Sequence, residues 1–299
     1  MIDRRWIFSA LVAMVWLVPA ARGQAVHVPL KGTALDVDVA GHLFVLDKDR
    51  GTLTMYDASL TVMATAGGPG WEGGSFDQPA GIWARNGLDI FVADHGNHRI
   101  QRFDRTLTYV SSLSTRSGDD AATSFGYPTD VTVSRFGALY ICDTENNRIV
   151  RVDAANTVQG SFGGIGAGAG RLDHPLQVTV GPDDQVFVLD PPRVMVYDLF
   201  GNFLTVLSDG VVRSPARLAG DERGIVVADG ADLTFINALH RPTGRLPLAE
   251  ATGLATPEVL GLCLNGGKLY ILTPGMLHII PDPRGAGADG LLDKEPDNH

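Results

Sequence analysis

One short phrase recurs six times along this chain of 299 residues, and it restricts the possible folds more than any other feature. The phrase is an apolar strand that ends in a polar residue, a short turn and a second apolar strand. Its polar positions are Asp47, Asp94, Asp143, Asp190, Asp229 and Thr273, at spacings of 47, 49, 47, 39 and 44 residues. Repeats of this length are typical of β-propeller blades, which have four strands each.

The second unit shows how a repeat divides into strands, which we name A to D in chain order. Strand A is "AGIWAR", strand B "LDIFVAD", strand C "RIQRFD" and strand D "YVSSLS", with glycine, asparagine or aspartate in the turns. The sixth unit has no strand D after Pro281, whereas "AVHVPL" at residues 25–30 has a strand pattern and no other place. We therefore predict an all-β, six-bladed β-propeller with four antiparallel strands per blade. The N-terminal strand, about residues 25–30, closes the last blade and removes the exposed sheet edges.

The two ends of the chain differ from the repeats. Arg4 and Arg5 precede an apolar run from Trp6 to Val18, and small residues follow, as in a signal peptide. We predict a signal peptide at 1–23, with cleavage near Gln24 or, alternatively, near Val26; an uncleaved anchor is the other possibility. The propeller then occupies 24–282 and a disordered tail 283–299. The mature chain is expected to be secreted or periplasmic, without stable insertion in a membrane.

Charge and cysteine content exclude some classes of function. The net charge is −10, and removal of the signal peptide makes it −12. Such a chain should repel nucleic acid, because nucleic-acid binding depends on lysine and arginine contacts to phosphate. A disulfide between Cys142 and Cys263 is possible in an exported protein, but their units lie far apart in the ring. We expect two buried free thiols.

The second and third units closely resemble the NHL repeat. The resemblance rests on an aromatic residue and a proline before strand A, and on an "Asp-x-x-Asn-x-Arg-Ile" pattern after strand B. The matching residues are Phe76, Pro79, Asp94, Asn97, Arg99 and Ile100, and then Phe125, Pro128, Asp143, Asn146, Arg148 and Ile149. The other units are more degenerate copies of the same repeat, so the resemblance extends over the mature chain. The resemblance to the NHL repeat implies the same six-bladed propeller.

The polar residues of this pattern have a structural explanation. The aspartate can accept turn N–H groups, the asparagine can adopt the left-handed conformation of the B–C turn, and the arginine can form an ion pair. A ring of acidic residues that binds a cation is the alternative, and its members would be Asp47, Asp94, Asp143, Asp190 and Asp229. That alternative requires short distances to one ion, yet strand B lies one strand away from the axis.

Strand A lines the axis of a propeller, so its polar residues are candidate ligand contacts. The starts of the A strands, together with the inward position of the second blade, give Asp36, Trp83, Asp130, Gln177 and Arg217 at the axial channel mouth. These residues could bind a small polar or sugar-like ligand, with Trp83 as a stacking surface. A water-filled channel with internally paired charges is the alternative.

Three histidines fall on the face that carries the D–A loops and B–C turns, and we treat them as candidate loop-face ligand contacts: His95, His98 and His174. The longer loops of this face cluster around blades one to four, which predicts an asymmetric pocket there. Some six-bladed relatives, the peptidyl-hydroxyglycine amidating lyases, bind zinc through histidines. These three histidines match no motif of that lyase, so we assign no cofactor and keep calcium or zinc as alternatives.

The predicted function is that of an exported binding module. Its loop face would bind a protein, a peptide or a glycan outside the cytoplasm, because the chain shows repeats and a signal peptide but no catalytic motif. The alternative is a metal-dependent propeller enzyme of the lyase or lactonase type, with its site at the axial channel mouth. No nucleic-acid partner is expected.

Overall fold

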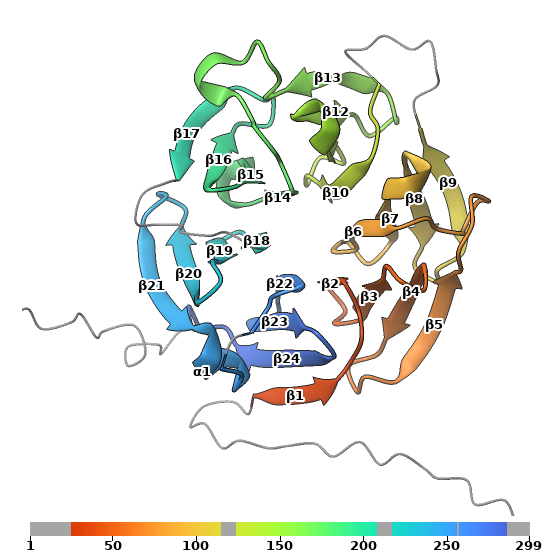
Figure 1. Ribbon diagram of the computed structural model, residues 1–299, viewed down its shortest axis with the longest axis vertical. Helices are drawn as coiled ribbons and strands as arrows, with labels where there is room; N and C mark the ends of the chain where they lie inside the picture. Colours follow the sequence, from red (N-terminus) through yellow and green to blue (C-terminus); the bar gives the residue numbers. More distant parts are fainter. Residues whose placement is uncertain (1–24, 115–123, 208–216, 256, 286–299) are drawn as a thin grey trace, which may run out of the picture.

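The computed structural model describes residues 25–114, 124–207, 217–255 and 257–285. Six four-stranded antiparallel sheets surround a central axis as the blades of a propeller (Figure 1). The predicted fold class is confirmed, including the number of blades and of strands per blade.

In the first three blades, the strands follow chain order from the axis outward. Their bounds are β2 (Ala34–Val37), β3 (Leu43–Asp47), β4 (Thr52–Tyr56) and β5 (Val62–Gly67); β6 (Pro79–Trp83), β7 (Asp89–Asp94), β8 (Arg99–Asp104) and β9 (Tyr109–Leu113); β10 (Pro128–Val133), β11 (Leu139–Asp143), β12 (Arg148–Val152) and β13 (Val158–Phe162).

Blades four and five repeat this order, and the sixth borrows its outer strand from the N-terminus. Their bounds are β14 (Gln177–Val180), β15 (Val186–Asp190), β16 (Arg193–Tyr197) and β17 (Phe203–Leu207); β18 (Arg217–Asp221), β19 (Gly224–Ala228), β20 (Asp232–Asn237) and β21 (Pro242–Pro247); β22 (Gly261–Asn265), β23 (Lys268–Thr273), β24 (Met276–Pro281) and β1 (Val26–Pro29). One short helix, α1 (Leu248–Thr252), joins blades five and six.

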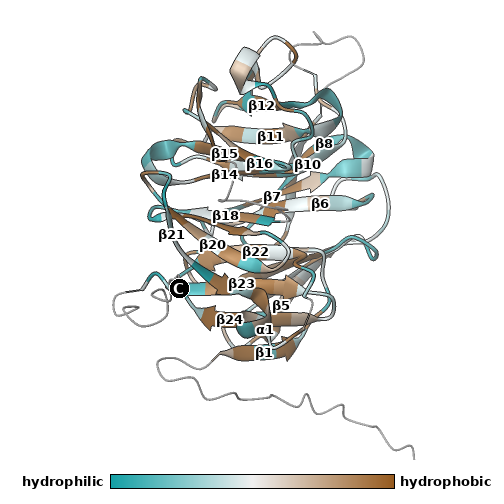
Figure 2. Ribbon diagram, turned by 60° about the vertical axis from the view of Figure 1, so that its left-hand side comes forward, coloured by the Kyte–Doolittle hydropathy of each residue, from teal (hydrophilic) through white to brown (hydrophobic). Residues whose placement is uncertain are grey.

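The hydrophobic core is divided among the six interfaces between blades. Each of the six buried clusters combines side chains of two adjacent blades; for example, Leu53 of blade one packs with Phe103 of blade two. The last cluster joins blade six to blade one through Leu277, Val45 and their neighbours. Figure 2 shows the apolar colour in the strands and the polar colour mainly in the connections. Because one blade's apolar face is covered only by the next blade, the sheets are stable as a closed ring.

The connections form two faces. The loop face carries the D–A loops and the B–C turns, of which 48–51, 95–98 and 144–147 belong to the first three blades. The turn face, at the other end of the axis, carries the A–B and C–D turns. The B–C turn of blade four has only two residues, 191–192, so the longer turns do cluster in blades one to three as predicted.

The ring closes where β1 pairs antiparallel with β24, as the sequence predicted. In this pair His27 lies opposite His278, and their Nδ1 atoms are 2.7 Å apart. One Nδ1 atom must donate and the other accept, so the two Nδ1 atoms cannot both carry a proton.

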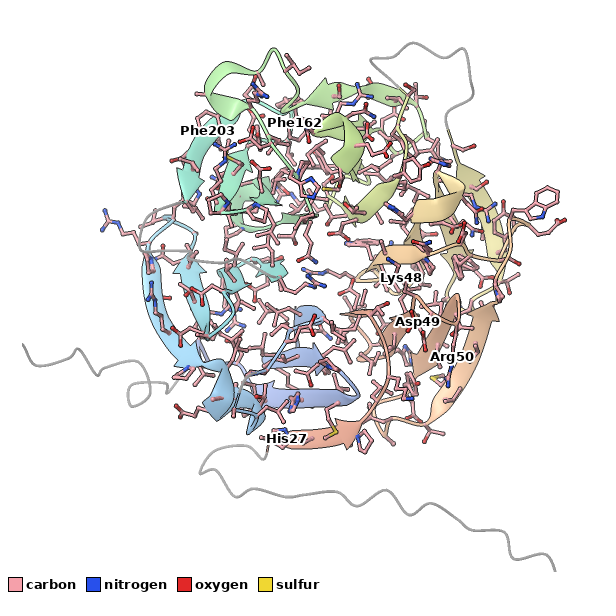
Figure 3. All side chains as sticks on the ribbon, viewed as in Figure 1. His27, Lys48, Asp49, Arg50, Phe162 and Phe203 are labelled. Carbon is pink, nitrogen blue, oxygen red and sulfur yellow. The ribbon has the colours of Figure 1, made fainter. Side chains whose placement is uncertain are left out.

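The surroundings of the two histidines keep them neutral. His278 is almost fully buried, and its Nε2 lies 3.0 Å from the Thr273 hydroxyl. Burial and the facing His27 lower the pKa of His278 to about 4, and burial also lowers the pKa of His27. Figure 3 shows His27 on the outer edge of the ring.

The remaining expectations about the chain concern its cysteines and its ends. Cys142 and Cys263 are both buried and free, as predicted, and they lie in blades three and six. The signal peptide at 1–23 lies outside the described residues. Of the expected tail, 283–285 are described, and Arg284 forms ion pairs with Asp221 and Asp282. No helix within the described ranges has the length and apolar character needed to cross a membrane.

The histidine pair predicts that acid weakens the ring closure. Both pKa values lie below 6.5 in the folded state, so the unfolded chain binds more protons as the pH falls from about 6.5 to about 4. The free energy of unfolding should therefore fall over this window, by about 2 kcal/mol for His278. Urea unfolding at about pH 7.5 and pH 4.5 measures the loss.

Two variants test the assignment to this pair. His278→Gln should reduce the pH-dependent loss of stability. His174→Gln changes an exposed side chain of the loop face and should leave that loss as it is. Equal losses in both variants would contradict this explanation.

Candidate functional site

The aspartate that ends strand B in the second blade is a structural centre of the loop face. Asp94 is fully buried, and its carboxylate accepts hydrogen bonds from the Asp77 N–H (2.8 Å), Asn97 Nδ2 (2.9 Å), Arg99 Nε (2.7 Å) and Gln101 Nε2 (2.9 Å). Arg99 in turn donates to the carbonyls of Trp71, Glu72 and Ser75. The NHL pattern thus fixes the glycine-rich loop before blade two onto the B–C turn.

The third blade repeats this arrangement. Asp143 accepts from Asn146 Nδ2 and Arg148 Nε, both at 2.9 Å, and from the Gly126 N–H. The prediction that the asparagine itself is left-handed is wrong. The left-handed residues are the next ones, His98 at φ 53° and Asn147 at φ 51°, because the asparagine lies in a 3-10 turn from which its amide reaches the aspartate.

A second set of polar side chains links the inner strands to one another. Asp130 Oδ2 accepts from the Val178 N–H of the next blade (3.0 Å). Gln177 Oε1 accepts from the Leu218 N–H (2.9 Å) in the same way. Arg217 Nε donates to the Leu260 carbonyl (2.7 Å). Each residue therefore joins its own blade to the following one.

These inner-strand residues surround a cavity of about 260 Å³ at the loop-face end of the axis. All six blades contribute to its wall, which we call the loop-face cavity. Six residues of the wall occupy equivalent positions, because each pairs with the residue just before the repeated polar position after strand B. They are Ala34, Gly81, Asp130, Gln177, Arg217 and Gly261. Thr33, Lys48 and Thr129 add polar groups to the wall. Figure 3 shows Lys48 on the side of its blade that faces the axis, whereas Arg50 lies farther out.

Asp130 is the acidic residue among those that line this cavity. Burial raises its pKa to about 7, nearby Asp36 acts in the same direction, and Arg217 and the Val178 N–H oppose the shift. Gly81 gives this carboxyl its space, because a Cβ there would lie 2.4 Å from Asp130 Oδ1. A carboxyl group that changes charge near neutral pH can make the binding of a ligand pH-dependent or exchange a proton with it.

The five residues predicted at the channel mouth occupy two levels. Asp130, Gln177 and Arg217 lie together in the loop-face cavity. Asp36 and Trp83 lie two residues farther along the inner strands, where Asp36 pairs with Phe44 and Trp83 with Phe91. The first blade has no proline to mark the start of its inner strand, and its true equivalent position is Ala34. Expecting Asp36 at the mouth was therefore wrong by two residues.

Asp36 instead has partners between the two ends of the axis. It accepts from the Ala84 N–H (2.8 Å) and from Cys263 Sγ (3.1 Å), and it lies 3.5 Å from Arg85 Nε. Trp83 contributes to the wall of a different cavity, of about 890 Å³, at the turn face. The sequence reasoning missed Lys48 and Arg85. The signal for Lys48 was the long first B–C turn, and the signal for Arg85 was its place two residues after Trp83, just beyond the end of β6.

The three loop-face histidines do not converge. His95 and His98 both contact Tyr127, with ring centroids 5.2 and 3.9 Å away, and His98 Nδ1 accepts from the Tyr127 N–H. His174 follows two blades on, and its backbone N–H donates to Asp190. Within the described ranges, no three histidine, cysteine, aspartate or glutamate side chains are grouped as a metal site would require. The histidines present therefore do not fit a three-histidine zinc centre.

The role of Asp94 can be tested by its removal. Asp94→Ala leaves the buried guanidinium of Arg99 without its carboxylate, so we expect a loss of about 3–5 kcal/mol in the free energy of unfolding. Asp89→Ala in the same blade removes only a half-exposed ion pair with Arg102 and should cost less than about 1 kcal/mol. Urea unfolding of the two variants makes the comparison, and equal costs would show that the buried network does not stabilise the blade.

Comparison with known proteins identifies the repeat in the two blades where its pattern is most complete. The NHL repeat family model matches residues 76–103 and 125–152, which lie in blades two and three. A probable peptidyl-alpha-hydroxyglycine alpha-amidating lyase from Caenorhabditis elegans is 36% identical over 171 residues, which cover 56% of this chain and 46% of the relative. Protein brain tumor from Drosophila melanogaster is 32% identical over 133 residues, 44% of this chain and 12% of the relative. The chain thus spans less than half the length of these curated relatives.

Solved structures show the same architecture. Virginiamycin B lyase from Staphylococcus aureus, with quinupristin, has a TM-score of 0.60 and 14% identity, over 91% of this chain and 96% of that one. A gluconolactonase from Xanthomonas campestris has a TM-score of 0.60 and 15% identity, over 86% and 89%. At these identities the likeness shows the fold alone. Together these findings show a chain that contains two NHL repeats, at residues 76–103 and 125–152, within a six-bladed β-propeller fold.

Proposed function

We propose that this propeller is a binding module that works outside the cytoplasm and holds the polar end of a peptide or glycan in its loop-face cavity. The observation that carries the proposal is the convergence of Lys48, Asp130, Gln177 and Arg217 on one cavity at the axis. Its volume of about 260 Å³ is small, so it suits one residue or one sugar unit of a longer ligand.

The chemistry of the wall favours a ligand with hydrogen-bonding and anionic groups. Lys48 and Arg217 bring two positive charges, and Gln177 and Thr129 bring neutral polar groups. Asp130 is neutral below about pH 7 and negative above it. An anionic group of the ligand should therefore be bound more tightly in mildly acidic solution, where the wall carries its larger positive charge.

The rest of the ligand would lie on the loop face around the cavity. The B–C turns of the first three blades project there, and Tyr127 lies between His95 and His98 as an aromatic contact surface. Rigid blades beneath these turns keep the surface preorganised, which lowers the entropy cost of binding.

Binding to peptide and glycan arrays tests this proposal, with the purified chain from residue 24 onward as the probe. For the ligands found, Lys48→Ala should raise Kd by about tenfold, because a charged hydrogen bond is lost. Lys268→Ala, on an exposed lysine of blade six outside the loop-face cavity, should leave Kd unchanged. Asp130→Asn should remove the pH dependence of Kd near about pH 7. An absence of ligands on both arrays, or ligands insensitive to Lys48 and Asp130, would reject the proposal.

A second candidate function is that of an enzyme at the same cavity. It is favoured by the match of 171 residues to a probable amidating lyase, and Asp130 offers a group that can transfer a proton near neutral pH. The experiment incubates the protein with a peptidyl α-hydroxyglycine and with a sugar lactone, with and without added zinc or calcium. An enzyme should release the peptide amide and glyoxylate, or the open acid, at a rate that falls in Asp130→Asn. Product formation no faster than in buffer alone would exclude both activities.

A further inference from the structure

The turn face contains a second axial cavity, larger than the loop-face cavity. This turn-face cavity has a volume of about 890 Å³ and is lined by the inner A–B turns of blades one to five. Arg85 lies in its wall, and its guanidinium donates to the Gly220 carbonyl on the opposite side of the ring. The same guanidinium contacts the buried Asp36. The wall residues of the two cavities do not overlap, and Arg85 lies in the wall of the turn-face cavity alone.

Most charges of this cavity are compensated within the chain. Arg135 pairs with Asp184 at 2.5 Å, and Asp221 pairs with Arg284 at 2.8 Å. Two carboxylates in the wall, Asp183 and Glu222, are exposed and take part in no ion pair within the described residues. Blades four and five therefore present negative charge that nothing in the described chain neutralises.

The inner turns of blades one to three carry exposed apolar side chains, one of which, Phe136, has the guanidinium of Arg135 4.8 Å from its ring centroid. Val39 is 76% exposed in blade one, Leu88 is 63% exposed in blade two and Phe136 is 63% exposed in blade three. Asp183 and Glu222 occupy the corresponding turns of blades four and five. On the turn face, exposed apolar side chains thus lie in blades one to three and the unpaired carboxylates in blades four and five, around the turn-face cavity. Exposed apolar groups arranged around a concavity are typical of interaction surfaces.

The charge of the chain selects among the possible partners. A second copy would bring another chain of net charge −10 against the acidic side, and an anionic membrane would be repelled as well. A partner with positive charges on one side and apolar groups on the other complements both sides of the face at once.

We propose that the turn face is a docking site for a cationic amphipathic segment of another protein. The segment lies across the ring with its apolar side chains on Val39, Leu88 and Phe136, and its lysines or arginines enter the turn-face cavity at Asp183 and Glu222. This surface is distinct from the loop-face cavity, so both faces can be occupied together.

The test uses a synthetic peptide of leucine and lysine, arranged so that the leucines share one helical face, and titrates it calorimetrically at low salt. We expect binding that weakens as salt is added, because screening reduces the attraction of exposed charges. The double variant Asp183→Asn/Glu222→Gln should raise Kd by about tenfold or more and flatten the salt dependence. Asparagine tolerates the positive φ of 54° at residue 183, so the turn should keep its shape.

A matched control removes the same charge from the other face. Glu72→Gln/Glu145→Gln changes two exposed loop-face carboxylates and should leave Kd unchanged. Leu88→Ser, which removes an exposed apolar side chain, should weaken binding without altering its salt dependence.

Four outcomes would overturn the proposal: no binding at low salt, equal losses in the two double variants, equal binding of a peptide with glutamate in place of lysine, or binding to anionic lipid vesicles. A concentration-dependent dimer that Leu88→Ser dissociates would assign the face to a second copy and would overturn it as well.

Discussion

Ring closure is the constraint on which the rest of the molecule depends. Each sheet covers one apolar face of its neighbour, and the sixth sheet must meet the first for every face to be covered. The contact of β22 with β2 supplies the inner part of this last interface, and the pairing of β1 with β24 supplies its outer strand. An open array of repeats would leave two apolar faces and two strand edges exposed to solvent. The N-terminal strand is thus as much a part of the sixth blade as any strand that follows it in the chain.

The side chains at the axis that join neighbouring blades also line the cavity to which we propose that a ligand binds. Asp130 joins blades three and four through the Val178 N–H, and it also lies in the wall of the loop-face cavity. Gln177 has the same double position between blades four and five. Such groups are held rigidly by their backbone partners, which keeps them in place before any ligand arrives. A substitution at these positions therefore changes the ring as well as the cavity, whereas Lys48 contributes to the cavity from a turn.

Much of the architecture was predictable because it is encoded locally. The spacing from Asp47 to Thr273 gave the blade count, and alternation within one repeat gave strands A to D.

The level of each inner-strand residue along the axis was harder to predict. In blades two and three the pairing shifts by one residue after Pro79 and after Pro128, and the first blade lacks such a proline. Alignment on the prolines therefore placed Asp36 level with Asp130, although hydrogen-bond register places Ala34 there. The turn face was missed for a different reason: Val39, Leu88 and Phe136 each occupy a different position relative to the glycine of their turns, so no repeated apolar position marks them in the sequence.

Arg85 connects opposite sides of the ring across the axis. Its guanidinium extends from blade two to the carbonyl of Gly220 in blade five, diametrically across the ring, while Asp36 holds it from blade one. The two cavities lie at opposite ends of the axis, and their wall residues do not overlap. Arg85 thus ties together blades two and five, which share no hydrophobic cluster, so any change in the distance between these opposite sheets has to break the hydrogen bond to Gly220.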